Sequence, residues 1–119
     1  MPYNEETVQR IRVALDDKGV AFEEKAMFGG ICFMVDDKML CASKIDKRTG
    51  DERLMCRLGE ARAAEAVEDP AVVPMSHGGR CMPGFVYVSE EGYRTAADLK
   101  KWLQLSLDYN PEAKKSGKK

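Results

Sequence analysis

The sequence predicts an α+β fold: an antiparallel sheet of about five strands with N- and C-terminal helices packed on one face. Two observations predict this class. Helical periodicity is found near the two ends and in one short middle segment, and the segments between them are strand-like and separated by turn residues. The expected order is α-β-β-β-β-α-β-α. Since 119 residues hold only one core, we expect a single domain over residues 1–109 and a basic, disordered tail over 110–119.

The first helix is expected over residues 5–18. Asn4 is a good N-cap, Glu5 and Glu6 place negative charge on the first turn, and Gly19 can end the helix. The side chains that helical spacing places on one stripe are Val8, Ile11, Arg12 and Leu15.

The next segments change to strand periodicity. Strands are expected at Phe22, at Lys25 to Phe28, at Ile31 to Val35, at Met39 to Ile45 and at Arg53 to Leu58. Asp36 and Asp37 form a turn signal, and residues 46–51 form a longer polar loop.

The second half returns to helix and then to one strand. The expected elements are a helix at 59–67, an irregular segment at 70–83, a strand at 85–88 and a helix from Ala96 to about Leu107. Thr95 with Asp98 resembles a capping box at the start of the last helix.

Sulfur is abundant, with four Cys and seven Met. If Asp36-Asp37 is a two-residue hairpin loop, Met34 faces Met39 and Cys32 faces Cys41 across the ribbon. Alternation then places these four side chains on one face, which we expect to be partly solvent-accessible because the aliphatic face belongs under the helices.

Three functions compete for this Cys/Met face. It can be adaptable apolar filler, a partner surface that includes a homodimer contact, or a thiol or soft-metal site responsive to redox conditions. Filler is the expected state, and no metal or cofactor is predicted; the weak candidates for metal ligands are Cys32, Met34, Met39 and Cys41.

Signals for catalysis are absent from the motifs. His77 lies four residues before Cys81, but a Cys–His pair needs a third group to orient the base, and the 74–84 loop supplies none that the sequence reveals. Neither Gly-Gly pair has phosphate-loop spacing, and no GxGxxG occurs. We therefore predict a protein that is not an enzyme, with Cys/His chemistry in that loop as the exception to test.

The charge balance limits the partners. The chain has 19 Lys plus Arg and 20 Asp plus Glu, a net charge of -1, which argues against a wholesale polyanion binder. Lys44, Arg53 and Arg57 are candidates for a modest basic patch that contacts an acidic protein or, secondarily, nucleic acid. An acidic N-terminus and the lack of a long apolar run favour a cytoplasmic location without membrane contact.

Two segments resemble the N-terminal domain of the TfoX/Sxy family. They are Met27-Phe28-Gly29-Gly30-Ile31-Cys32-Phe33-Met34-Val35 and Gly79-Arg80-Cys81-Met82-Pro83-Gly84-Phe85-Val86-Tyr87-Val88, with Trp102 fitting the last helix. The resemblance covers about residues 3–107. It departs at Asp37-Lys38, where the family often has Gly, and at Cys81, where Pro is common.

The resemblance implies a central antiparallel sheet and kinship with regulators of competence (DNA-uptake) genes, which act as coactivators beside a DNA-binding transcription factor. Those regulators usually carry a second, helical domain, so the implied partner is a transcription factor or such a domain on a separate chain. The motif implies no catalytic residue. The positions that it marks for an interaction surface or small-molecule pocket are Met27, Phe28, Gly29, Gly30, His77, Arg80 and Tyr87.

Overall fold

The computed structural model describes residues 3–27, 30–46, 48–77 and 80–113; at 27, 76–77 and 80–82 the description covers the backbone. The helices are α1 (Glu5–Asp17), α2 (Glu60–Ala66) and α3 (Ala96–Tyr109), with 3₁₀ turns η1 (Glu90–Tyr93) and η2 (Asn110–Glu112). The strands are β1 (Glu23–Met27), β2 (Gly30–Val35), β3 (Lys38–Ile45), β4 (Glu52–Arg57), β5 (Val72–His77) and β6 (Arg80–Ser89). The predicted α+β class is confirmed.

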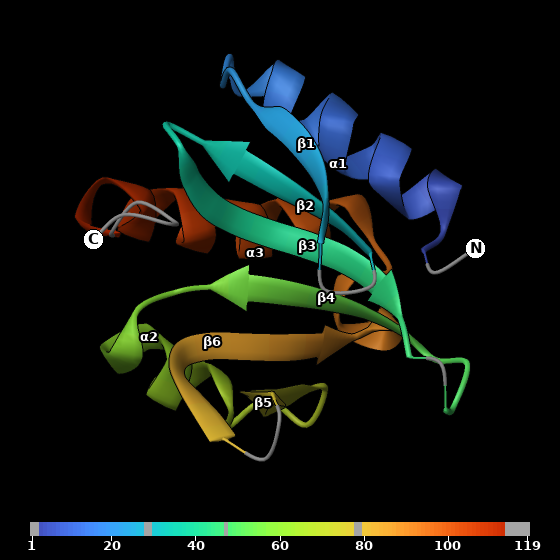
Figure 1. Cartoon of the computed structure of the whole chain (residues 1–119), viewed down its shortest axis with the longest axis vertical. Coiled ribbons are helices and arrows are strands. Elements are labelled where there is room, and N and C mark those ends of the chain that lie inside the picture. Colours follow the sequence, from blue (N-terminus) through green and yellow to red (C-terminus); the bar gives the residue numbers. More distant parts are fainter. Residues whose placement is uncertain (1–2, 28–29, 47, 78–79, 114–119) are drawn as a thin grey trace.

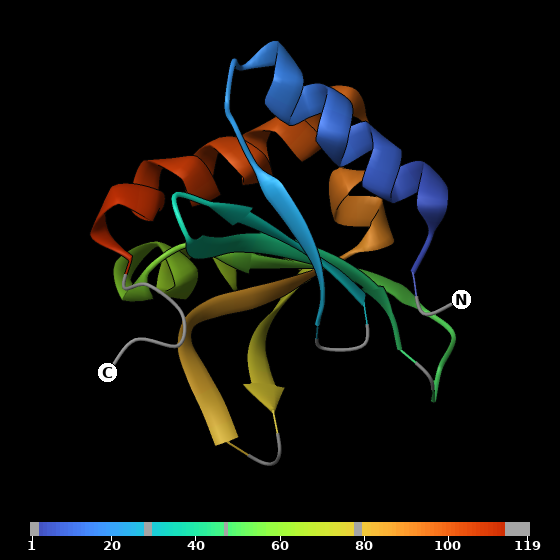
Figure 2. The ribbon, with the colours of Figure 1, turned by 45° about the horizontal axis from the view of Figure 1, so that its top comes forward.

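The sheet is antiparallel throughout, in the order β1-β2-β3-β4-β6-β5. Both α1 and α3 lie across the same face, as the sequence predicts (Figure 1). The β5–β6 hairpin bends away from these helices (Figure 2), and α2 packs beside β6. The sheet therefore has a helix face, covered by α1 and α3, and an opposite face turned toward the β5–β6 hairpin.

The described residues contain six strands, one more than expected. The prediction of an irregular segment over 70–83 was wrong, because Val72–His77 forms β5 at the edge of the sheet. Edge strands tolerate proline, whose missing N–H can face away from the ladder. The pairing with β6 shifts between Pro74 and Ser76, and Gly84 adopts a φ of 88°. Proline and glycine thus interrupt this ladder without ending the strands.

The predicted helix caps are confirmed. The side-chain oxygen of Asn4 accepts a hydrogen bond of 2.8 Å from the backbone N–H of Glu6. Gly19, at a φ of 71°, donates its N–H to the carbonyl oxygen of Asp16 at 2.9 Å. The Thr95 hydroxyl accepts from the backbone N–H of Asp98 at 3.1 Å. These contacts satisfy backbone groups that a helix end leaves without partners.

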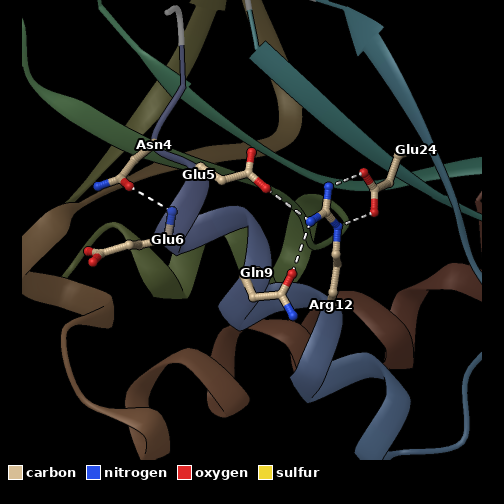
Figure 3. A network of polar contacts seen from close by, with 6 residues as sticks. All are labelled: Asn4, Glu5, Glu6, Gln9, Arg12 and Glu24. Atoms are coloured by element: carbon tan, nitrogen blue, oxygen red, sulfur yellow. Dashed lines mark hydrogen bonds and ion pairs between the residues drawn. The ribbon is translucent and has the colours of Figure 1, made fainter.

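Arg12 joins α1 to the edge strand β1 instead of facing the core (Figure 3). Its Nε and one terminal nitrogen donate to the two carboxylate oxygens of Glu24, at 2.6 and 2.9 Å. Its other terminal nitrogen donates to Glu5 at 3.1 Å and to Gln9 at 3.0 Å. The hydrogen bonds that Arg12 donates to Glu24, followed by the one that it donates to Glu5, hold the pKa of Arg12 above its usual value. A bidentate pair of this kind fixes the geometry between the two elements.

The β2–β3 hairpin confirms the predicted turn and corrects the predicted stripe. Asp36 and Asp37 have φ values of 57° and 64°, as a two-residue type I′ turn requires, and Met34 lies opposite Met39. Between Phe33 and Met34 the register shifts by one residue. The extra residue on β3 is Leu40.

This β-bulge moves Cys41 away from the other three predicted side chains. Cys41 lies opposite Phe33 and belongs to the core under the helices, whereas Cys32 lies opposite Ala42 on the other face. The predicted pairing of Cys32 with Cys41 was therefore wrong, as was the prediction that all four sulfur side chains share one face. A bulge reverses alternation beyond it, and no glycine marks this one.

The helix face holds the larger core. It includes Val8, Ile11, Leu15, Phe33, Leu40, Leu54, Cys56, Val86, Val88, Tyr93, Leu99, Trp102 and Leu103. The indole N–H of Trp102 donates to the carbonyl oxygen of Gly92 at 2.9 Å, which ties α3 to η1. Beyond α3, Asn110 and Ala113 are also buried, so residues 110–113 pack against the body of the domain.

Candidate functional site

Five cationic and aromatic side chains gather on the opposite face of the sheet. Strand pairing places Lys44 opposite Arg53, Met55 opposite Tyr87, and Arg57 opposite Phe85. Alternation then puts Lys44, Arg53, Arg57, Phe85 and Tyr87 on one face, which we call the cation–aromatic face. The candidate basic patch and two residues of the second motif segment, Phe85 and Tyr87, are thereby brought together.

The cations of this face lie over its rings. The Lys44 Nζ atom is 5.6 Å from the centre of the Tyr87 ring, and the guanidinium carbon of Arg53 is 5.1 Å from the same point. The guanidinium carbon of Arg57 is 5.4 Å from the Phe85 ring. These distances are in the range of attraction between a cation and the negative face of a ring. The Tyr87 ring is consequently 7% exposed, although it lies at the surface side of the sheet.

Arg53 is oriented by a second contact. One of its terminal nitrogens lies 3.2 Å from a carboxylate oxygen of Asp46, in the loop between β3 and β4. The backbone N–H of Arg48 hydrogen-bonds the Asp46 carboxylate and is the main cause of its lowered pKa, to which the charge of Arg53 adds. Asp46 therefore stays ionised at neutral pH and holds the guanidinium at the edge of the face.

A cleft of about 390 Å³ adjoins Arg53 and Tyr87. Its walls include the side chains of Val73, Ser89 and Arg94. The Ser89 hydroxyl is buried and has no hydrogen-bond partner among the described residues. The cleft is lined by two arginines, Arg53 and Arg94, and also by four acids, Asp51, Glu52, Glu90 and Glu91, so its charge is mixed.

Beneath these cations lies a second, smaller buried cluster. It consists of Cys32, Met34, Met39, Ala42, Met55, Met75 and Tyr87, with Phe85 packed against it. The expectation that the Cys/Met face is partly solvent-accessible was wrong, because each of these described side chains is buried within the single chain. The bend of the β5–β6 hairpin explains this, since it brings Met75 over a sheet face that no helix covers.

The described thiols are free and buried. Burial raises the pKa of Cys32 to about 11 and that of Cys56 to about 12, and it holds that of Cys41 well above the usual range. A thiol is a nucleophile only as the thiolate. These three residues are therefore poor candidates for nucleophilic chemistry in the folded protein.

Among the described residues, no three His, Cys, Asp or Glu side chains come together in a way that would hold a metal ion. The helices there are all too short or too polar to cross a membrane.

Residues 17–109 match the profile of the TfoX N-terminal domain family. The chain belongs to this family. No curated protein and no solved structure shows significant similarity to it. The identification rests on most of the chain and agrees with the resemblance in its two motif segments.

The structure describes the first TfoX motif only in part. Phe28 and Gly29 lie outside the described residues, as does the side chain of Met27. Gly30 lies opposite Lys44, and a Cβ atom there would overlap the carbonyl oxygen of Ser43 and approach the Lys44 Cβ within 2.7 Å. This glycine permits close contact between β2 and β3, which is a structural role.

The second TfoX motif forms β6. The backbones of His77 and Arg80 pair at the end of the β5–β6 hairpin, but their side chains lie outside the described residues, as does that of Cys81. The predicted Cys/His exception in the 74–84 loop is thus not tested. Phe85 and Tyr87 are the motif residues that the structure places in the cation–aromatic face.

The sequence analysis missed a buried carboxylate. It is Glu52, which is 8% exposed and accepts hydrogen bonds from three side chains. The donors are Asn4 at 2.9 Å, Thr7 at 2.6 Å and the Tyr93 hydroxyl at 2.6 Å. Burial, followed by these contacts with Glu52, raises the pKa of Tyr93 far above its usual value.

A buried lysine was missed as well. The Lys38 Nζ atom donates to the carbonyl oxygens of Asn110 and Pro111, at 3.2 and 3.4 Å, and lies 3.6 Å from an Asp36 carboxylate oxygen. Lysine near a helix C-terminus stabilises carbonyl groups that the helix leaves unpaired. Lys38 and Glu52 therefore have structural roles on the helix side of the sheet.

Proposed function

We propose that this TfoX N-terminal domain is a non-enzymatic regulatory protein that works through contact with another protein. The observation that carries the proposal is the cation–aromatic face, where Lys44 and Arg53 both lie over Tyr87. Cations and aromatic rings on a rigid sheet are suited to an acidic partner segment. Lys44 and Arg53 come from adjacent strands, so strand pairing fixes the spacing of their charges.

Family membership supports the regulatory part of this proposal. TfoX proteins resembling this chain are competence regulators that act beside a DNA-binding transcription factor, and we propose such a factor as the partner of the cation–aromatic face. An acidic segment of the partner would pair with Lys44 and Arg53, while the neighbouring cleft would take an adjacent side chain. A cytoplasmic location is part of the same proposal.

Nucleic acid is the second candidate for this face. Proteins that bind single strands combine cations with rings on which bases stack. Here the Tyr87 ring is 7% exposed, so little of it is open to a base. The net charge of -1 also provides weak long-range attraction for a polyanion. We therefore place a protein partner first.

The deciding experiment is charge reversal with a matched control. In native cells, tagged chains carrying Lys44→Glu or Arg53→Glu are compared with the unaltered chain and with Lys101→Glu. Lys101 is the matched control because its Nζ atom also lies over an aromatic ring, that of Trp102 at 4.6 Å, but on α3. We expect the unaltered chain and Lys101→Glu to copurify a DNA-binding transcription factor and to change the same transcripts.

The two variants in the sheet should lose that factor and its transcriptional effect together. If all three variants retain both, the proposed face is wrong. Filter binding to single-stranded DNA separates the second candidate, since phosphate contacts would make affinity fall steeply as salt concentration rises. Binding of that kind without recovery of a transcription factor would replace the protein partner with nucleic acid.

A further inference from the structure

The smaller buried cluster contains five sulfur-bearing side chains from one region of the sheet. They are Cys32, Met34, Met39, Met55 and Met75, and we call them the sulfur cluster. None of them is more than 6% exposed. Their neighbours in the cluster are Ala42 and Tyr87, so the surroundings contain few groups that compete for a metal ion.

Two of the sulfur atoms already contact each other. The Cys32 thiol donates a hydrogen bond to the Met34 Sδ atom, with the two sulfur atoms 3.7 Å apart, and a bound ion would replace the thiol proton in this contact. With metal–sulfur bonds of roughly 2.3 Å, an ion between them would make an angle of about 107° with the two sulfurs. That angle is close to tetrahedral. Met39 lies directly opposite Met34 on β3, which puts a third sulfur side chain beside this pair.

We propose that Cys32, Met34 and Met39 form a binding site for one monovalent soft cation, Cu(I), independently of the proposed regulatory function. Thiolate and thioether ligands favour Cu(I) over harder ions. Binding removes one proton from the Cys32 thiol to solvent and forms the copper–sulfur bonds, with no change in oxidation state. The thiolate and Cu(I) together carry no net charge, whereas Zn²⁺ would leave one uncompensated positive charge in an apolar cluster.

The β-bulge at Leu40 selects these ligands. Without it, Cys41 would share the face of Cys32, and a second thiolate would give the Cu(I) complex a negative charge. With it, Cys41 lies on the helix face opposite Cys56. The site therefore has one thiol and surrounding thioethers, a set that matches the charge of a monovalent ion.

The protonation of Cys32 gives the site a defined pH dependence. A cysteine thiol keeps its proton at neutral pH, whereas the metal ligand is the thiolate. Each Cu(I) bound must release that proton, and apparent affinity should rise about tenfold for each unit of pH. Adventitious binding to Met side chains alone would show no such slope.

The test uses the full chain under anaerobic, reducing conditions, with Cu(I) titrated against the competing chelator bicinchoninate. We expect one Cu(I) bound per chain, with apparent affinity rising as pH increases from 6 to 8. Because the site exists in the folded state, bound Cu(I) should also raise the unfolding temperature.

Three variants assign the ligands. Cys32→Ala should abolish the single bound equivalent, and Met34→Leu, which keeps the volume and removes the sulfur, should weaken binding by about tenfold or more. Cys56→Ala is the matched control, because that thiol is equally buried on the helix face and should leave binding unchanged. The rise in unfolding temperature is compared within each variant, so loss of stability alone cannot imitate loss of the site.

Several results would overturn the proposal. One is absence of bound Cu(I) in the unaltered chain when the chelator is concentrated enough to remove Cu(I) from short peptides that contain Met and Cys. Another is equal loss of binding in Cys56→Ala and Cys32→Ala, and a third is a fall in unfolding temperature on addition of Cu(I), which would mean that the ion binds the unfolded chain. None of these results would affect the charge-reversal experiment on Lys44 and Arg53.

Discussion

On the helix face, β4 contributes Leu54 and Cys56; on the other face the same strand contributes Arg53, Met55 and Arg57. The first set packs under α1 and α3 among aliphatic and aromatic side chains. The second set packs among thioethers, with its cations lying over aromatic rings. Both Leu54 and Met55 are fully buried.

This difference shows two ways of burying one sheet. Under the helices, branched and aromatic side chains pack in one fixed arrangement. The buried carboxylate of Glu52 accepts hydrogen bonds there from three side chains. On the other face, flexible thioethers adapt to their neighbours, and cations extend from the buried layer to solvent. Stability should therefore depend mainly on the helix face, and partner binding on the other face.

The largest expected loss of stability comes from Glu52→Ala. It leaves the hydroxyls of Thr7 and Tyr93 and the amide of Asn4 without their acceptor, and the free energy of unfolding should fall by about 4 kcal/mol. Urea unfolding of Glu65→Ala, an exposed acid on α2, provides the control, with an expected change within about 0.5 kcal/mol. A similar small change in Glu52→Ala would mean that the buried network contributes little.

The same network predicts loss of stability in alkali. The pKa of Tyr93 is raised in the folded state, so the folded protein holds this proton more tightly than the unfolded chain. The resulting contribution to the free energy of unfolding is fully present below the pKa of tyrosine in the unfolded chain, about 10. It is lost as pH rises above that value. The raised pKa values of Cys32 and Cys56 add a loss of the same sign. Unfolding measured from pH 8 upward should show the decline, and Tyr93→Phe should reduce its slope.

A core substitution on each face tests the comparison directly. Leu54→Ala leaves a cavity under the helices and should lower the free energy of unfolding by about 3 kcal/mol. Met55→Leu on the other face conserves volume and should change it by less than about 1 kcal/mol. Urea midpoints of both variants provide the measurement. A larger loss for Met55→Leu than for Leu54→Ala would show that the sulfur cluster is the more tightly fitted of the two.

The next effect in size concerns the end of α3. Lys38→Met removes the donor to the carbonyl oxygens of Asn110 and Pro111, and we expect a loss of about 1.5 kcal/mol. Lys100→Met, an exposed change on α3, is the control. Proteolysis of the segment after α3 should also become faster in Lys38→Met only; equal rates in the two variants would contradict the proposed role of Lys38.

The smallest effect is expected on the cation–aromatic face. Arg53→Gln removes a partly exposed ion pair with Asp46 and a contact with the Tyr87 ring, at a cost of about 0.5 kcal/mol. Thermal unfolding provides the measurement. A loss above that of Lys38→Met would show that this face stabilises the fold, which would weaken its assignment to a partner.

Much of the fold could be predicted from local signals. The caps at Asn4 and Thr95 and the turn at Asp36-Asp37 are set by neighbouring residues, and each has the expected geometry. Strand β5 was missed because Pro74 normally argues against a strand, while here it lies in an edge strand where its missing donor costs little.

The candidate site was less predictable. Glu52 could have been found, because alternation from Leu54 and Cys56 places it on the helix face. Lys38 could not, since its partners Asn110 and Pro111 lie far along the chain and meet it only after α3 has packed. The gathering of Lys44, Arg53 and Tyr87 depended on β6 pairing with β4, which sequence spacing does not reveal.

The bulge at Leu40 divides β3 into two stretches in which the alternation of side chains is reversed. Before Leu40, odd-numbered residues such as Met39 face away from the helices. After it, even-numbered residues such as Lys44 do so. When TfoX sequences are aligned, a gap of one position in this strand would therefore exchange the faces of every residue on one side of the gap. The position of the bulge in each relative decides whether its cysteines, methionines and lysines correspond to those of this chain.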